Sequence, residues 1–117
     1  MGQLTTHVLD ISVGLPAAGV RIDVHEAGAR DSVLLASAVT GADGRLGAPL
    51  LQGAGFRAGG VTVTFHLADY FRSRGVSLPT PAFLETATIT IGIADAEQHY
   101  HVPLLIAPWS YSVYRGG

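Results

Sequence analysis

The side chains that could do chemistry in this chain are mainly histidine and arginine. All seven basic residues are arginine, five histidines are present, and lysine and cysteine are absent. A Schiff-base lysine, a Walker-type phosphate loop, a cysteine nucleophile, a thiolate zinc site and a disulfide scaffold therefore each lack their central residue. The Gly-x-Ser-x-Gly elbow of common serine hydrolases is also missing. The inventory favours proton transfer by histidine and charge stabilisation by arginine.

Two histidines stand one residue apart near the C-terminus. On a strand, His99 and His101 would point to the same face, where they could share a zinc ion. Only Glu97, at the start of the expected strand, offers a nearby acidic ligand, so a structural metal is the weaker interpretation of this pair. Taken alone, His7 and Arg45 are more often exposed side chains than catalytic ones, and Arg45 follows an Asp-Gly turn.

Short strands must position these side chains. Alternating apolar and polar residues are separated by Gly, Pro and Asp, a pattern that predicts half-buried strands. The expected strands are 4–11, 20–26, 33–40, 61–66, 87–93, 98–106 and 111–115, with a short irregular one within 46–51. Residues 68–74 break the alternation and predict a short helix that ends at Gly75. Seven or eight strands with one short helix predict an all-β fold, an antiparallel β-sandwich.

The outer faces of two strands are unusual. The core face of the penultimate strand is plainly apolar, so His99, His101 and Pro103 must look outward. In the first strand, Thr5 and His7 share the face opposite the core. An outer face that mixes histidine with apolar residues is typical of an interface or a binding wall. Pro103 lacks the N–H that a sheet ladder uses, so we expect a local irregularity there.

Composition limits the remaining function classes. Of 117 residues, 48% are hydrophobic and 14% charged, and the formal net charge is −2. This charge gives no electrostatic footprint for nucleic acid, and no apolar run is long enough to cross a membrane. The first residues lack the features of a secretory signal, so we expect a cytoplasmic protein. The length fits a single domain, and the apolar excess indicates that another subunit covers part of the surface.

Four segments together resemble one family, the 5-hydroxyisourate hydrolases, which are transthyretin-like proteins of urate (purine) breakdown. The segments, in order, are LTTHVLD (4–10), TGADGR (40–45), HYHVPLL (99–105) and YRG (114–116). The expected helix and the Pro-containing loop after it also stand where that family has them. The resemblance covers nearly the whole chain and rests on the order and spacing of the motifs.

This resemblance implies roles for five residues. His7, Arg45 and His101 would be catalytic, and His7 and Arg45 would also bind substrate. Tyr114 would line the substrate pocket, and Arg115 would support binding. Histidine suits proton transfer because its ordinary pKa is about 6.5, and arginine offers forked donors to a developing oxyanion. Which histidine is the general base stays open.

The resemblance also implies a reaction and an assembly. Water would attack a cyclic amide of 5-hydroxyisourate and give 2-oxo-4-hydroxy-4-carboxy-5-ureidoimidazoline, with no cofactor and no metal required. Residues 1–117 would form one transthyretin-like domain. The domain would assemble as a homotetramer, a dimer of dimers, with the sites at the interface between dimers. Gly117 replaces a terminal serine common in the family, so it receives no side-chain role.

Two other interpretations remain. A non-catalytic transthyretin-like carrier of small ligands would share the architecture, but the resemblance implies that such carriers lack the His/Arg/His set and the terminal Tyr-Arg-Gly. A metal-binding sandwich would use the histidines as ligands and would lose activity with a chelator.

Overall fold

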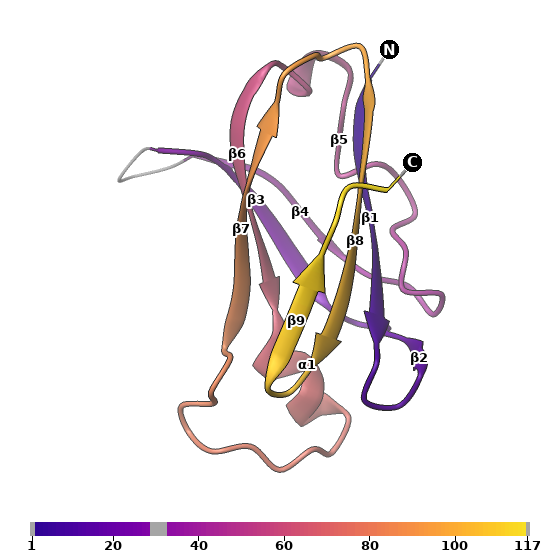
Figure 1. The fold of residues 1–117 in the computed structure, drawn as a ribbon, viewed down its shortest axis with the longest axis vertical. Coiled ribbons are helices and arrows are strands. Elements are labelled where there is room, and N and C mark those ends of the chain that lie inside the picture. The colour runs from indigo at the N-terminus through magenta and orange to yellow at the C-terminus, as the bar shows by residue number, and fades with distance from the viewer. Residues whose placement is uncertain (1, 29–32, 117) are drawn as a thin grey trace.

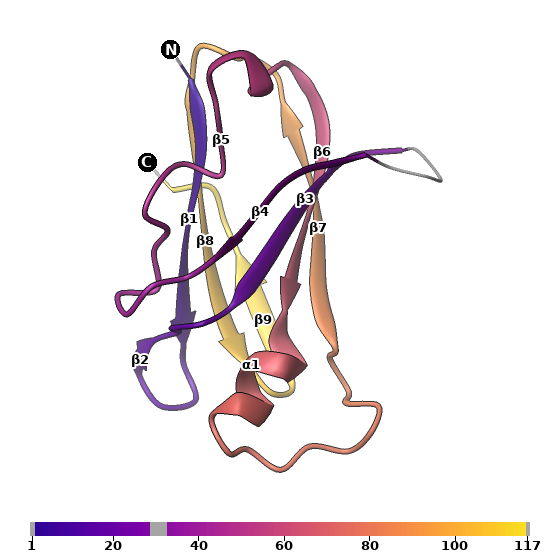
Figure 2. The same ribbon diagram turned by 180° about the vertical axis from the view of Figure 1, so that it is seen from behind.

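Two β-sheets lie face to face in the computed structural model of the chain, which describes residues 2–28 and 33–116 (Figures 1 and 2). The first sheet has five strands in the order β2-β1-β8-β9, with β5 pairing with β1: β1 (Gln3–Asp10), β2 (Leu15–Pro16), β5 (Leu51–Gln52), β8 (His99–Ala107) and β9 (Ser110–Val113). The second sheet has four in the order β4-β3-β6-β7: β3 (Arg21–Glu26), β4 (Leu34–Val39), β6 (Gly59–His66) and β7 (Thr86–Ile93). The predicted β-sandwich is confirmed.

The strand boundaries differ from the predicted ones mainly at short elements. The strands β2 and β5 have two residues each, and the irregular strand expected within 46–51 is reduced to β5 (Leu51–Gln52). Gly47 and Pro49 explain that difference, because neither residue type favours a continuous ladder. A 3₁₀ turn, η1 (Gly53–Gly55), follows β5.

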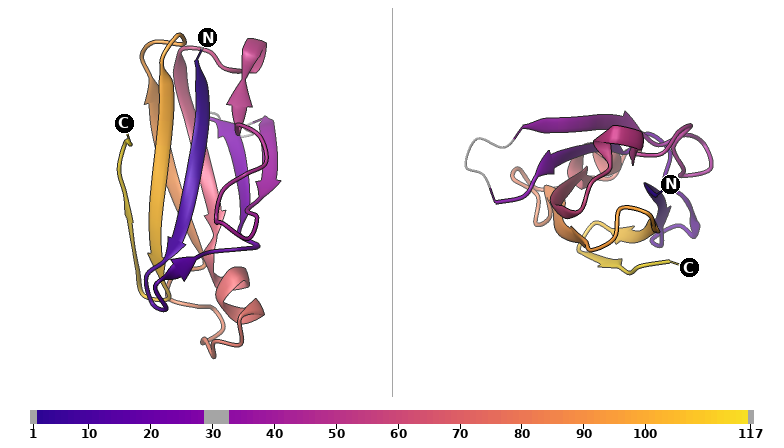
Figure 3. Two further views of the ribbon diagram at one scale, coloured as in Figure 1. Left: turned by 90° about the vertical axis from the view of Figure 1, so that its right-hand side faces the viewer. Right: turned by 90° about the horizontal axis from the view of Figure 1, so that it is seen from above.

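One strand pair is parallel. The N-terminal strand β1 lies between β2 and β8, and it runs parallel to β8 in a continuous register (Figure 3). Thr5 stands opposite His101, and His7 stands opposite Pro103. The two outer faces recognised in the sequence are therefore neighbours in space.

The prediction of a local irregularity at Pro103 is wrong. The register between β1 and β8 passes through Pro103 without a shift, and Pro103 is buried in a central strand. On its other side, the Pro103 carbonyl accepts a hydrogen bond from the Tyr114 N–H at 3.4 Å. The N–H and C=O of a strand residue point the same way, so the donor that proline lacks would face the C-terminal segment. The regular part of β9 ends there, at Val113, so the missing donor falls outside the β9 ladder.

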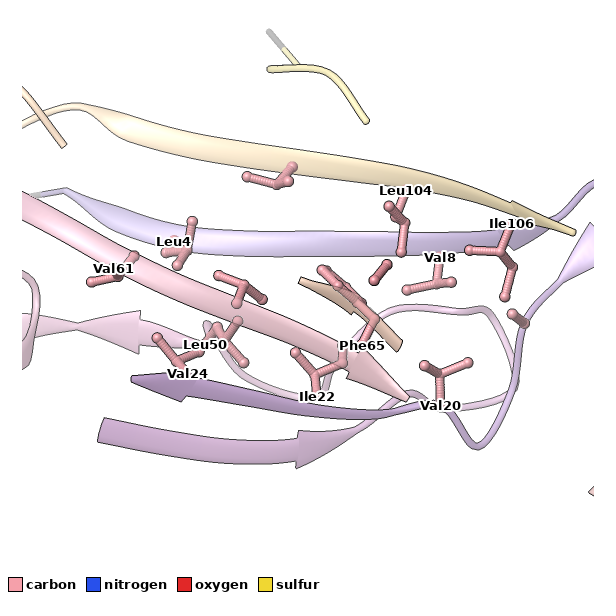
Figure 4. Packing of buried hydrophobic residues seen from close by; sticks show 14 of the residues in the cluster. Leu4, Val8, Val20, Ile22, Val24, Leu50, Val61, Phe65, Leu104 and Ile106 are labelled. Atoms are coloured by element: carbon pink, nitrogen blue, oxygen red, sulfur yellow. The ribbon is translucent and has the colours of Figure 1, made fainter. Parts of the chain in front are cut away.

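The core between the sheets fixes which residues look outward. Figure 4 labels ten of its side chains, namely Leu4, Val8, Val20, Ile22, Val24, Leu50, Val61, Phe65, Leu104 and Ile106. In β1 the buried residues alternate with half-buried ones, as the sequence predicts. Burial of each such side chain stabilises the fold by about 1.5–3 kcal/mol, so a one-residue slip of β1 would be costly. This register holds Thr5 and His7 on the outer face.

The helix α1 (Leu67–Ser73) covers one end of the sandwich and agrees with the predicted helix to within a residue. Gly75 follows it with φ +84°, the left-handed conformation that favours glycine at a helix end. The Tyr70 hydroxyl donates to Asp10 Oδ2 at 2.9 Å and joins the helix to the end of β1. Burial first, and then the neighbouring Asp10 carboxylate, raises the pKa of Tyr70 to about 12. No helix in the described part of the chain is long and apolar enough to span a membrane.

Large apolar side chains remain exposed at the end of the first sheet where β1 and β8 finish. Ile11 and Val13 in the turn between β1 and β2, and Leu15 at the start of β2, are each more than half exposed. The turn between β8 and β9 leaves Trp109 67% exposed. The two turns lie side by side where β1 and β8 end (Figure 1). Exposed large apolar side chains that gather at one end of a sheet are typical of a contact surface.

Candidate active site

A tight turn holds Arg45 against the first strand. His7 and Arg45 pair in an antiparallel bridge, and the Val8 N–H donates to the Gly44 carbonyl at 2.9 Å. Within the turn, Asp43 Oδ1 accepts the Arg45 N–H at 2.9 Å. Gly44 has φ +77°, and a Cβ there would lie 2.3 Å from the Val8 carbonyl oxygen. The Asp-Gly turn seen in the sequence is therefore the element that places Arg45 beside His7.

The ring of His7 is held by the same turn. Its Nε2 lies 2.8 Å from the Asp43 carbonyl oxygen. A carbonyl oxygen only accepts, so Nε2 must carry the proton of this hydrogen bond. When His7 is neutral, its unprotonated nitrogen is therefore Nδ1.

The other two histidines of the first sheet share one threonine. Thr5 Oγ1 lies 2.8 Å from His101 Nδ1 and 2.8 Å from His99 Nε2. The ring centroids of His99 and His101 are 6.2 Å apart. The pleat explains this arrangement, because His99 and His101 point to one face and Thr5 of the neighbouring strand projects between them.

A pocket of about 440 Å³ brings Arg45 and His101 together. Its lining comes from β1, β8 and the loop after Arg45: Thr5, Thr6, Arg45, Leu46, Ala48, His99 and His101. His7 does not line this pocket, although it lies on the same strand face as Thr5 and pairs with Arg45. The charge of an arginine thus faces a half-buried histidine across an opening large enough for a small planar ring.

The environment of His101 favours its neutral form. Desolvation by partial burial lowers the pKa of His101, and the positive charge of Arg45 lowers it further, with smaller contributions from His99 and His7. A neutral imidazole near pH 7 is able to accept a proton from water.

The residues of the C-terminal Tyr-Arg-Gly motif lie in two different places. Gly116 lies against His101: its N–H donates to the His101 carbonyl at 2.7 Å, and a Cβ on Gly116 would stand 2.8 Å from His101 Cδ2. Tyr114 and Arg115 instead line a separate pocket of about 370 Å³, together with residues of β7 and β8. A single chain therefore does not bring these two residues into the pocket of His101.

Arg115 has partners of its own. Its Nη2 donates to Gln98 Oε1 at 3.0 Å and to the His99 carbonyl at 3.3 Å. Its guanidinium carbon lies 4.0 Å from the centroid of the Tyr100 ring. These contacts lie where β8 begins, so Arg115 supports the backbone of the histidine-bearing strand. Gly117, which received no role, lies outside the described residues.

The sequence interpretation gave no role to Thr5 and treated His99 only as a metal ligand. The alternating strand pattern could have identified both residues, because Thr5 lies on the same outer face as His7 and His99 lies on the same outer face as His101. What was missing was the parallel pairing that sets these faces side by side. Within residues 2–28 and 33–116, no three His, Cys, Asp or Glu side chains gather closely enough to hold a metal ion.

Comparison with known proteins places this chain in a family. A model described as HIUase/Transthyretin family matches residues 4–116. The 5-hydroxyisourate hydrolase 2 of Rhizobium meliloti (strain 1021) is 52% identical over 115 residues, which are 98% of this chain and 96% of that protein. A solved structure of Klebsiella pneumoniae 5-hydroxyisourate hydrolase is 36% identical with a TM-score of 0.82 and full coverage of both chains. A crystal structure of (S)-allantoin synthase is 43% identical with a TM-score of 0.90, and this chain, covered to 99%, spans 44% of that longer one. By this match over nearly its whole length, the chain belongs to the HIUase/Transthyretin family.

Proposed function

We propose that this chain hydrolyses 5-hydroxyisourate in urate degradation, with His7, Arg45 and His101 as its catalytic residues. The observation that carries the proposal is the pocket that joins Arg45 to His101, in a chain 52% identical to a protein named 5-hydroxyisourate hydrolase 2. The enzyme is a hydrolase acting on a cyclic amide C–N bond, and its proposed chemistry uses His7, Arg45, His101 and water.

His101 is the general base in this mechanism. Its neutral form persists near pH 7 because desolvation and Arg45 lower its pKa. Water gives a proton to His101 while its oxygen bonds to the amide carbonyl carbon. The carbonyl becomes an oxyanion beside the Arg45 guanidinium, and a preorganised donor at such a place typically contributes about 3 kcal/mol of barrier lowering. When the intermediate collapses, the C–N bond breaks and the leaving nitrogen takes up the proton.

His7 orients the substrate and assists the proton transfers. Because Asp43 occupies its Nε2–H, the neutral ring offers Nδ1 as a hydrogen-bond acceptor. An acceptor suits the ring N–H groups of a purine-derived substrate. Arg45 binds the substrate through its carbonyl oxygens as well as stabilising the oxyanion.

The active unit is a homotetramer, a dimer of dimers, in the cytoplasm. Exposed apolar side chains at the two turns of the first sheet support a subunit contact on the sheet that carries the pocket. Tyr114 and Arg115 support the same conclusion, because their predicted roles at the substrate require a surface that a single chain does not complete. Residues 1–117 act as one transthyretin-like domain in this assembly.

The test follows the ultraviolet absorbance of freshly generated 5-hydroxyisourate after addition of the purified protein. Decay should accelerate in proportion to enzyme concentration, and native mass spectrometry should give a tetramer. A non-catalytic carrier would instead bind the substrate in a fixed stoichiometry and leave its spontaneous decay rate unchanged or slower. That second result would overturn the proposed function.

A further inference from the structure

We propose that Thr5 is a positioning residue whose hydroxyl, backed by His99, fixes the tautomer of His101 so that Nε2 is the nitrogen that accepts a proton. The inference deepens the proposed function and rests on it. It starts from one geometric fact, that a single hydroxyl lies 2.8 Å from a ring nitrogen of each histidine.

A hydroxyl between two nitrogens has only one proton to give. Thr5 Oγ1 can donate to one ring and must accept an N–H from the other. In the first arrangement, His99 donates to Thr5 and Thr5 donates to His101 Nδ1, so His101 carries its proton on Nε2. In the second, His101 Nδ1–H donates to Thr5 and Thr5 donates to His99 Nε2, so Nε2 of His101 is free of a proton.

The second arrangement is the one that fits a base. When His101 takes up a proton, both of its nitrogens carry hydrogen, and Nδ1 can then only donate. The second arrangement already has that direction, so protonation at Nε2 requires no rotation of Thr5. The first arrangement would have to reverse both hydrogen bonds during the reaction. Groups that need no reorganisation at the moment of reaction are the effective ones in catalysis.

The surroundings of His99 and His101 agree with the second arrangement, in which His101 Nδ1–H donates to Thr5. His99 is exposed, so water satisfies its other nitrogen whichever tautomer it adopts. His101 is half-buried, and among the described residues Thr5 supplies the hydrogen bond to its ring. Gly116 lies against Cδ2 of the same ring, and a Cβ there would stand 2.8 Å from that atom. The ring is thus fixed by packing on one edge and by Thr5 at Nδ1, which leaves Nε2 as the nitrogen that Thr5 does not engage.

Two variants of Thr5 test the role of its hydroxyl. Thr5→Val removes the hydroxyl and keeps the shape, so kcat should fall about tenfold to a hundredfold while KM stays within about twofold. Thr5→Ser keeps the hydroxyl and should retain kcat within about threefold. Thr62→Val serves as the control, because Thr62 is also a half-buried strand threonine but belongs to β6 in the other sheet. A Thr5→Val enzyme with unchanged kcat would overturn the inference.

A spectroscopic measurement tests the tautomer itself. Long-range ¹H–¹⁵N correlation spectra of the ¹⁵N-labelled wild-type protein should give the pattern of Nδ1–H and unprotonated Nε2 for His101. Neutral histidine in water favours the opposite tautomer, so Thr5→Val should shift the pattern toward Nε2–H. A wild-type His101 with its proton on Nε2 would refute the assignment even if Thr5→Val does not fold. An inactive wild-type enzyme would refute the proposed function, while this spectrum would still decide the tautomer.

Discussion

His7 and Arg45 lie opposite each other in an antiparallel bridge, so the turn at residues 41–45 acts as an extension of the first sheet. The bridge depends on Gly44, whose φ of +77° and close approach to the Val8 carbonyl leave no room for a side chain. The position of the Arg45 charge is therefore set by the backbone of the turn.

Gly44→Ala should lower both stability and activity. The substitution introduces about 1–2 kcal/mol of left-handed strain and also a clash, because a Cβ would lie 2.3 Å from a backbone oxygen. The turn must move away from β1, and Arg45 moves with it. Thermal unfolding and kcat/KM measure the two effects.

Gly75→Ala is the matched control for this prediction. Gly75 has a similar φ of +84°, but a Cβ there meets nothing within 4 Å. This variant should lose stability through strain alone and keep its kcat/KM. Equal losses in the two variants would show that the contact with Val8 is unimportant.

Arg45→Gln should raise the pKa of His101 toward its ordinary value. Desolvation lowers that pKa first, and the Arg45 charge is the next cause, so removal of the charge leaves only part of the shift. Proton uptake by His101 would then begin at higher pH, and the acid limb of kcat/KM would move the same way. An NMR titration of His101 measures the pKa directly, and the rate should fall about 10²–10³-fold through loss of the oxyanion donor.

Arg57→Gln is the control for this charge effect, because Arg57 pairs with Glu26 at the second sheet. The pKa of His101 should be unaffected in that variant. A pKa of His101 that stays the same in Arg45→Gln would mean that the guanidinium does not face the ring in solution.

Tyr70→Phe should destabilise the fold without changing the chemistry of the pocket. Loss of the phenol leaves the buried Asp10 carboxylate without one of its donors, which costs about 1–3 kcal/mol. Denaturant unfolding measures this loss, and Tyr111→Phe, at a 39% exposed position, should change stability far less.

The same hydrogen bond gives an alkaline signature. The pKa of Tyr70 is raised from 10.0 to about 12 in the folded protein, so its contribution to stability is complete below pH 10 and lost as the pH rises through about 12. Wild-type protein should therefore lose more stability than Tyr70→Phe over that interval. Parallel losses in both proteins would contradict the assignment.

Local patterns predicted most of the elements of this fold. Alternation located the longer strands to within a few residues, and it assigned His101 and His7 to outer faces because the opposite faces are plainly apolar. The helix was recognisable from its broken alternation and from Gly75. Strands of two residues, such as β2 and β5, have too few residues to show a period, and β2 was missed.

Pairing between distant strands is what the sequence left open. The parallel register of β1 and β8 is a tertiary property, and it alone places Thr5 between two histidine rings. It also explains why Pro103 is tolerated in a central strand, since its missing donor faces the end of β9. The separation of Arg115 from His101 likewise follows from packing around Tyr100, for which no local pattern exists.

The central claim is that His101 carries the ring-opening chemistry, and His101→Gln tests it most directly. Turnover of freshly generated 5-hydroxyisourate should fall by at least about 10²-fold, while native mass spectrometry still gives the wild-type assembly. His25→Gln, at a half-buried histidine of β3 in the other sheet, should keep wild-type turnover. A His101→Gln enzyme that opens the ring at nearly the wild-type rate would contradict the account.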